Sequence, residues 1–238
     1  MTRRAVILEE AVDVVAALPE LHDALPRERT QAARRTLRAR ALHLRRGRWD
    51  AREDATMIEG GAGFLVIEGA LIRCVTAAHR TAGELLGPGD LIRPGADLYE
   101  DYQFTSYYRA ISDVRLGVLD ARFTRAAALV PEVVPALVAA MTRRAGMASR
   151  QLVVVQSQSV EARILVTLNY LADRWGIVTR EGIVLPEFLS HGTLALLLGA
   201  RRPSVTSAMV RLSARGDVQR RLDGRWLIGA SVEHSLVA

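Results

Sequence analysis

The sequence predicts an α+β fold in three consecutive parts: an antiparallel barrel or sandwich, one long helix, and a helix-turn-helix that ends in a hairpin. Three observations support this prediction. Short β-type runs separated by glycine and proline fill residues 41–119, as in small antiparallel barrels. Apolar residues at helical spacing follow, with no proline between Pro135 and Pro186. Two short helical segments and an Asp-Gly turn complete the pattern.

The composition indicates a globular chain with an anionic partner. Half of the 238 residues are hydrophobic and 24% are charged, which suits one to two domains. The formal net charge is +6, and all 32 basic residues are arginine. Without lysine, the chain cannot form a Walker A phosphate loop, a Schiff base or a kinase-type active site. Its one cysteine, Cys74, excludes an internal disulfide, a cysteine-rich zinc site and a four-cysteine iron–sulfur site.

We expect neither a membrane segment nor an export signal nor a catalytic site. The apolar runs are far shorter than the ~20 residues that span a bilayer, and Glu9 and Glu10 interrupt the N-terminal apolar stretch. Histidines at 22, 43, 79, 191 and 234 are scattered, which argues against a cupin-like metal centre and gives no spacing for a haem. Nucleophile-elbow and zinc-protease motifs are missing. The expectation is a cytoplasmic protein that is not an enzyme and carries no cofactor.

The N-terminal half begins with a segment rich in Ala, Leu and Arg, residues 1–40. Pro19 and Pro26 break this segment, so we expect short helices there. Strands are expected after it, at runs bounded by turn-forming residues. These runs are 41–45, 63–68, 71–76, 109–111 and 114–119.

Residues 120–159 are expected to be helical, with Pro131 and Pro135 near a helix start. One face repeats apolar or small residues at alternating steps of four and three, an average of 3.5. Such a seam is typical of a two-stranded coiled coil, so we expect a homodimer. A helix that lies on its own domain's core is the alternative. The predicted dimerisation seam consists of Val134, Val138, Met141, Ala145, Ala148, Leu152 and Val155.

Beyond residue 160 the pattern changes again. An amphipathic helix is expected over 161–175, with Gly176 as its C-cap. A small hairpin is expected over 177–185, around Arg180-Glu181-Gly182.

A helix-turn-helix is the most specific signal in the chain. Ser190 is expected to cap its first helix by accepting a backbone N–H bond. Ala195 lets the second helix cross closely, and Gly199 supplies the tight turn, where a Cβ would clash. Val205 is expected to anchor the second helix, residues 202–215, to the first.

This second helix is the expected reading helix for DNA. When such a helix enters the major groove, its N-terminal residues meet the base edges. Arg201 and Arg202 lie at its positive end, where a guanidinium can pair with guanine or phosphate. A solvated basic loop between two core helices is the alternative. The polar residues expected to contact DNA from the helix are Arg202, Ser204, Thr206, Ser207 and Arg211.

A basic hairpin follows directly and favours DNA binding over that alternative. Asp223-Gly224 is a two-residue hairpin signal, flanked by Arg220, Arg221 and Arg225. Arginines on such a wing are placed to meet the sugar–phosphate backbone, which supplies affinity and register. Trp226 is expected to pack in the core. The predicted partner is therefore double-stranded DNA.

Short motifs in both halves together resemble one known family. They are Gly-Phe-Leu-Val at 63–66, Leu-Gly-Pro-Gly-Asp-Leu-Ile at 86–92, Val-Glu-Ala-Arg at 160–163, Leu-Ser-His at 189–191, Gly-Ala-Arg-Arg-Pro-Ser-Val-Thr at 199–206 and Asp-Gly-Arg-Trp-Leu at 223–227. From about residue 37 to 228 the chain resembles the cyclic-AMP receptor protein / fumarate-nitrate regulator (CRP/FNR) family. The resemblance implies a β-roll sensor domain of the cyclic-nucleotide-binding type over 1–130, a dimerisation helix over 131–159 and a winged helix-turn-helix over 160–238. It also implies RNA polymerase as a partner.

The sequence departs from the family where a cyclic nucleotide would bind. The resemblance implies a Gly-Glu pair after the Gly-Asp-Leu-Ile segment, for the ribose, and an Arg-Ser pair further on, for the phosphate. Here Arg93-Pro94 and Phe104-Thr105 stand at those positions. Because proline and phenylalanine supply neither contact, we expect that cyclic AMP is not the effector. An unidentified nucleotide or small molecule, or a β-roll that serves only as a scaffold without any effector, are the two alternatives.

The reading helix also departs from the best-known family member, whose residues aligned with Pro203 and Ser207 are a base-reading Glu and Arg. The operator is therefore expected to differ, with Arg202 as the expected base reader. The family's phosphate-contacting positions are matched by Ser190, His191 and Ser204. His191 replaces an arginine, so its contact should be weaker and pH-dependent. The expected function is a homodimeric, sequence-specific transcription regulator on a near-palindromic operator.

Overall fold

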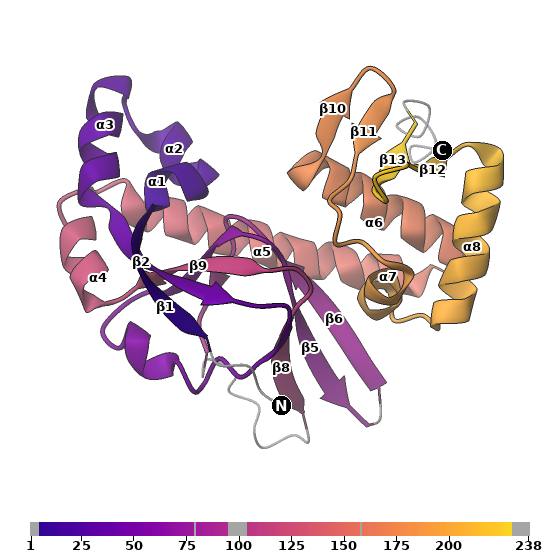
Figure 1. Cartoon of the computed structure of the whole chain (residues 1–238), viewed down its shortest axis with the longest axis horizontal. Helices are drawn as coiled ribbons and strands as arrows, with labels where there is room; N and C mark the ends of the chain where they lie inside the picture. Colours follow the sequence, from indigo (N-terminus) through magenta and orange to yellow (C-terminus); the bar gives the residue numbers. More distant parts are fainter. Residues whose placement is uncertain (1–4, 79, 95–103, 158, 230–238) are drawn as a thin grey trace. The chain divides into compact units, whose positions relative to one another are not determined.

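The computed structural model describes residues 5–78, 80–94, 104–157 and 159–229. The chain divides into two compact units, Met1–Met147 and Ala148–Ala238, each of which is described by itself (Figure 1). In the part of the chain that the structure describes, no helix combines the length and the apolar character that a bilayer crossing requires.

Two antiparallel sheets form the first unit, in agreement with the predicted β-rich half. Its strands are β1 (Val6–Asp13), β2 (Arg38–Leu44), β3 (Gly47–Trp49), β4 (Gly63–Glu68), β5 (Leu71–Ala77), β6 (Arg80–Leu86), β7 (Leu91–Ile92), β8 (Thr105–Ala110) and β9 (Val114–Leu119). Its helices are α1 (Val14–Ala17), α2 (Pro19–Ala24), α3 (Arg27–Thr36), the 3-10 turn η1 (Ala55–Ile58), α4 (Ala121–Ala127) and the first part of α5 (Val133–Gln156). The sheet orders are β1-β2-β9-β4-β7 and β3-β8-β5-β6.

An apolar core joins the two sheets. The ring of Trp49 on β3 lies 5.5 Å from the ring of Phe64 on β4 in an edge contact, and 5.5 Å from the ring of Tyr108 on β8. The indole N–H of Trp49 donates to the carboxylate of Asp54 at 2.8 Å, which satisfies its one polar group. Because both sheets contribute inward-facing side chains to this cluster, the first unit is a β-roll.

The N-terminal segment differs from the helical prediction. Residues Val6–Asp13 form strand β1, which pairs antiparallel with β2 at the edge of the five-stranded sheet. Helices begin only at Val14, where the carboxylate of Asp13 accepts the N–H groups of Val15 and Ala16. The strand depends on pairing with a segment some 30 residues away in sequence, so local composition could not reveal it. Strands β3 and β7 were missed for the same reason, because they pair with β8 and β4. Strand β6 was also missed, although it forms a hairpin with the preceding strand β5.

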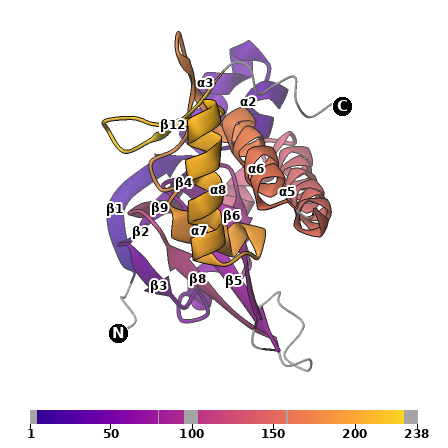
Figure 2. The same ribbon diagram turned by 90° about the vertical axis from the view of Figure 1, so that its right-hand side faces the viewer.

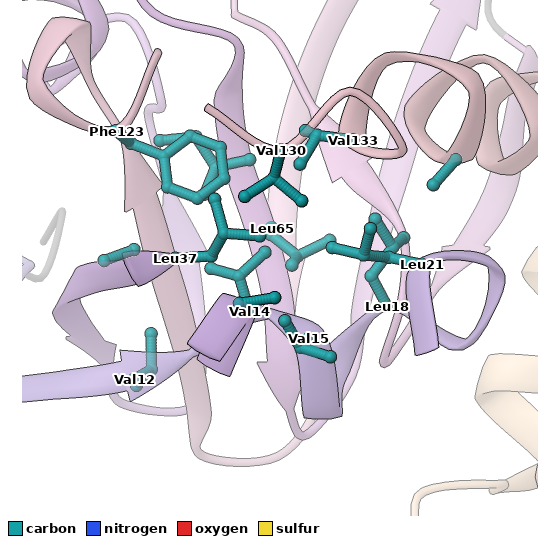
Figure 3. Packing of buried hydrophobic residues seen from close by; sticks show 14 of the residues in the cluster. Val12, Val14, Val15, Leu18, Leu21, Leu37, Leu65, Phe123, Val130 and Val133 are labelled. Carbon is teal, nitrogen blue, oxygen red and sulfur yellow. The ribbon is translucent and has the colours of Figure 1, made fainter. Parts of the chain in front are cut away.

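A second cluster seats the N-terminal helices on the five-stranded sheet (Figure 3). Leu18 and Leu21 of the first helices and Leu65 of β4 are fully buried in it. Val130 and Val133, just before and at the start of α5, close the cluster. This packing holds the start of the long helix on the β-roll.

The long helical region is interrupted rather than continuous. Asp120 caps α4 by accepting the N–H groups of Arg122 and Phe123, both at 3.0 Å. α4 ends at Ala127, and α5 begins at Val133. The break contains Pro131, which disfavours the helical conformation in the residue before it. The start of α5 at Val133 agrees with the predicted helix start near Pro131 and Pro135, whereas the non-helical residues 128–132 within the predicted helical region 120–159 were not expected.

Two arginines fasten α5 to the first unit. Arg143 donates to Glu20 at 2.6 Å and to the carbonyl of Gly89 at 3.2 Å. Arg144 donates to both carboxylate oxygens of Glu84 on β6, at 2.6 and 2.9 Å, and to the carbonyl of Leu91 at 2.7 Å. These bonds fix which side of α5 faces the β-roll.

The second unit is a small sheet with three helices, as predicted. Its elements are α6 (Val160–Trp175), β10 (Ile177–Thr179), β11 (Gly182–Val184), α7 (His191–Leu198), α8 (Arg202–Arg215), β12 (Val218–Arg220) and β13 (Trp226–Ile228). The sheet order is β10-β11-β13-β12. α6, α7 and α8 bury their apolar faces together, and α6 and α8 lie side by side (Figures 1 and 2).

Candidate DNA-binding site

The turn between α7 and α8 has the predicted helix-turn-helix geometry. Ser190 caps α7, because its hydroxyl accepts the N–H of Thr193 at 3.1 Å. Gly199 ends α7 with a left-handed φ of 58°. A Cβ at position 199 would meet no atom within 4 Å, so the predicted clash is wrong. Glycine is required there because of the backbone conformation instead.

One face of α8 is buried and the rest is open. Val205, the predicted anchor, is fully buried, together with Ala208, Met209 and Leu212. All of the residues predicted to contact DNA from this helix are exposed, and so is Arg201, which precedes it. The helix contains no acidic residue. An exposed helix of this kind is suited to approach a polyanion.

The arginines around α8 fall into two groups. Arg211 and Arg215 are bound to the carboxylate of Glu161 on α6, and Arg215 also pairs with Asp217 at 2.9 Å. Arg201 and Arg202 form no ion pair with any residue that the structure describes. The positive charge that is available to a ligand therefore lies at the N-terminal end of α8, where the helix dipole adds to it. Arg211, predicted to contact DNA, is held by an intramolecular partner.

His191 lies at the centre of a cluster that joins both helices to the wing. Its Nδ1 is 3.1 Å from the hydroxyl of Thr206 on α8, and its ring stacks on Trp226 with 5.6 Å between centroids. The guanidinium of Arg220 lies 4.7 Å over the same indole. Burial lowers the pKa of His191, and the charges of Arg220 and Arg202 lower it further. The neutral form of His191 is therefore favoured in the free protein.

The wing ends in a three-residue turn, not the predicted two-residue one. Arg221 and Arg225 form the last backbone pair, and the N–H of Gly224 donates to the carbonyl of Arg221 at 3.0 Å. Gly224 has a φ of 81°, which closes the turn after Leu222 and Asp223. Arg221 pairs with Glu181 at 2.8 Å, whereas Arg225 is 3.9 Å from Asp223. Trp226 is buried, as predicted, and its indole N–H donates to the carbonyl of Leu189.

The predicted dimerisation seam lies on the open side of α5. The side of α5 that packs on its own unit carries Val133, Ala136 and Ala140 instead. Six of the seven seam residues are exposed, and Val155 is half-buried. The exposed ones are Val134, Val138, Met141, Ala145, Ala148 and Leu152.

Sequence reasoning missed three participants of this site. Glu161 and Glu181 hold arginines that the sequence assigned to DNA, and Trp226 is the platform for His191 and Arg220 as well as a core residue. For Glu161, the sequence offered one indication of a role, which was its place in the first turn of the expected helix over 161–175. No group of three His, Cys, Asp or Glu side chains could hold a metal within the described ranges, and His79 and His234 lie outside them.

Comparisons with known proteins agree with this architecture. No family model matches the chain, and no curated protein matches it. Several solved structures match the chain. A CooA mutant from Carboxydothermus hydrogenoformans has a TM-score of 0.58 at 16% identity, with 80% of this chain and 83% of that chain covered. FixK2 from Bradyrhizobium japonicum has a TM-score of 0.58 at 16% identity, and the match covers 80% of this chain and 92% of FixK2. A CRP-family transcriptional regulator from Thermus thermophilus has a TM-score of 0.56 at 20% identity, and the match covers 80% of this chain and 94% of that regulator.

The chain has the fold of the CRP/FNR transcriptional regulators. These matches confirm the predicted fold class, in which an antiparallel β-roll is followed by a long helix and a winged helix-turn-helix. Several of the solved CRP/FNR structures are described as transcriptional regulators, a class that is not enzymatic.

The structure describes the residues at which the sequence resemblance implied, in other family members, contacts to a cyclic nucleotide. Arg93 donates to the carbonyl of Gly61 at 2.6 Å, so its guanidinium is engaged by the β-roll itself. Pro94 is buried, and Phe104 is 46% exposed. Residues 95–103 lie outside the described part of the chain.

Proposed function

We propose that the chain is a homodimeric, sequence-specific DNA-binding transcription regulator with a cyclic-nucleotide-binding-like sensor domain. The observation that carries the proposal is the set of cations around the N-terminal end of α8. Arg201, Arg202 and Arg220 form no ion pair with any described carboxylate, and α8 itself is free of acidic residues. A polyanion would supply the missing counter-charge.

The proposed roles follow from placement. Arg202, in the first turn of α8, reads a base edge in the major groove, where guanine offers two acceptors. Arg201 and Arg220 bind phosphates on either side of that contact. His191, whose Nδ1 faces Thr206, supports this surface from beneath. Ser190, Ser204, Ser207 and the wing arginines Arg221 and Arg225 add contacts that fix the register.

A homodimer is proposed from the exposed seam of α5. Apolar side chains at steps of four and three along a helix are costly to leave in water, and a second copy of the same helix buries them. The two reading helices would then meet a near-palindromic operator at half-sites about 34 Å apart. RNA polymerase is the further partner that the fold favours.

The sensor domain is proposed to respond to an effector other than cyclic AMP, because Pro94 and Phe104 supply no ribose or phosphate contact. The second candidate is a regulator without an effector, in which the β-roll is a scaffold. The bonds from Arg143 and Arg144 support it, since they fasten α5 directly to the β-roll. Thermal-shift measurements with cyclic AMP and cyclic dinucleotides separate the candidates, because a bound ligand stabilises the fold.

In vitro selection of DNA from a random library, followed by binding titrations at several salt concentrations, tests the function. We expect a near-palindromic consensus, and a linear fall of log affinity with log salt. Binding that depends on neither sequence nor salt would overturn the proposal.

A further inference from the structure

We propose that α8 reads the C5-methyl groups of thymine through an apolar strip centred on Val210. This inference rests on the proposed function and specifies which base feature the helix recognises. The strip consists of Pro203, Ser207, Val210 and Ala214.

The strip lies opposite the buried face of α8. Its members are spaced by four, three and four residues, which places them on one side of a helix. The residues that bury α8 in its domain lie on the other side. All four strip residues are exposed, and the Val210 side chain is 63% exposed. The part of α8 that points away from the protein therefore carries methyl, methylene and hydroxyl groups, and no charge.

Polar side chains that border the strip are held elsewhere. The guanidinium of Arg211 is bound to Glu161, next to that of Arg215. The hydroxyl of Thr206 is 3.1 Å from His191 Nδ1. Ser207 is thus the hydrogen-bonding group that remains in the middle of the helix. Beyond the first turn, where Arg202 lies, α8 has few means of reading a base by hydrogen bonds.

Charge indicates that the occupant of this strip is DNA and not an apolar protein surface. A single exposed valine is common on protein surfaces and by itself indicates no binding site. Val210, however, lies on the same helix whose N-terminal end is surrounded by Arg201, Arg202 and Arg220. The helix that carries it has no acidic side chain. A surface with cations at one end and small apolar groups along its length matches the major groove, where phosphates border the bases.

Thymine is the base that fits such a strip. In the major groove its C5-methyl is the apolar group that a side chain can meet, whereas the other groups are hydrogen-bond donors and acceptors. A branched, exposed valine buries that methyl without leaving a polar group unpaired. Burying one methyl corresponds to about a fourfold change in affinity.

The test removes single methyl groups from the operator. In the selected site, each thymine is replaced in turn by deoxyuridine, which lacks the C5-methyl and keeps every hydrogen-bonding group. We expect about a fourfold loss of affinity at one or two thymines of each half-site. In the variant Val210→Ala, affinity for the thymine operator falls, and the same deoxyuridine replacements have no further effect.

Val178→Ala is the matched control. Val178 is also an exposed valine of the second unit, 81% exposed, but it lies on β10. We expect this variant to bind like the wild type and to keep the full deoxyuridine penalty. Unchanged melting temperatures in both variants show that folding is intact.

Two results would overturn the inference while the proposed function stands: operator binding that is insensitive to every deoxyuridine replacement, or a full deoxyuridine penalty in Val210→Ala. Failure to bind any DNA would overturn both. Loss of a protein–protein contact in Val210→Ala, with DNA affinity unchanged, would show that the strip binds a protein instead.

Discussion

Arg144 on α5 and Glu84 on β6 form a two-pronged ion pair in which two guanidinium nitrogens lie 2.6 and 2.9 Å from the carboxylate oxygens. Burial alone would raise the pKa of Glu84, but the hydrogen bonds and charges of Arg144 and Arg73 outweigh it and lower that pKa. The pair therefore ties the long helix to the β-roll in the ionised state.

We expect Glu84→Gln to lower the free energy of unfolding by about 2–3 kcal/mol, because it leaves the charge of Arg144 without its full partner. The pKa of Glu84 is lower in the folded chain than its unfolded value of 4.5, so this contribution is present above that pH and is lost as the pH falls through the folded value. Urea unfolding at several pH values measures both effects. Glu68→Gln is the control, because the Glu68 pair with Arg115 is exposed and should contribute little.

Arg202→Ala is expected to cost about 1–3 kcal/mol of binding and to relax specificity at one base position. Arg211→Ala should change affinity much less, since its guanidinium is held by Glu161. Competition titrations against operators with single base changes give both numbers. An equal loss in the two variants would contradict the division of the arginines into bound and available groups.

His191 should make DNA binding pH-dependent. Its pKa is lowered in the free protein by burial and by the charges of Arg220 and Arg202, whereas DNA phosphates bound to these two arginines would offset their charge and raise it. The complex then binds more protons than the free protein, so affinity should rise roughly three- to tenfold as the pH falls from about 7.5 to 5.5. Anisotropy titrations across that range measure this rise, and His191→Gln should flatten it. A profile that keeps its slope in the variant would assign the effect to another group.

Met141→Arg should dissociate the proposed dimer, because it places two like charges within the apolar seam. Sedimentation velocity at micromolar concentration should show a monomer, and operator affinity should fall by at least tenfold. Leu129→Arg makes a comparable change at an exposed leucine outside the seam and should leave the dimer intact. A dimeric Met141→Arg protein would require a different interface.

In the helix-turn-helix, the sequence predicted correctly the features that depend on neighbouring residues. Ser190 and Gly199 delimit α7, and Val205 is buried, because caps and helical spacing are local properties. Strand β1 was missed, since Val6–Asp13 is a strand through its pairing with β2. The site shows the same division. The position of Arg202 at the start of α8 could be predicted from the motif alone. The binding of Arg211 by Glu161 joins residues 50 positions apart and required coordinates.

The turn at Gly199 has a stereochemical consequence. Its backbone is left-handed and the space around a Cβ is empty, so L-alanine would be opposed by its own chirality alone, at a cost of about 1 kcal/mol. D-alanine prefers this same conformation. Semisynthetic incorporation of the mirror-image residue would restrict the unfolded chain without disturbing the folded one. We therefore expect a more heat-resistant protein, at a site where the side chain of an L-residue is disfavoured.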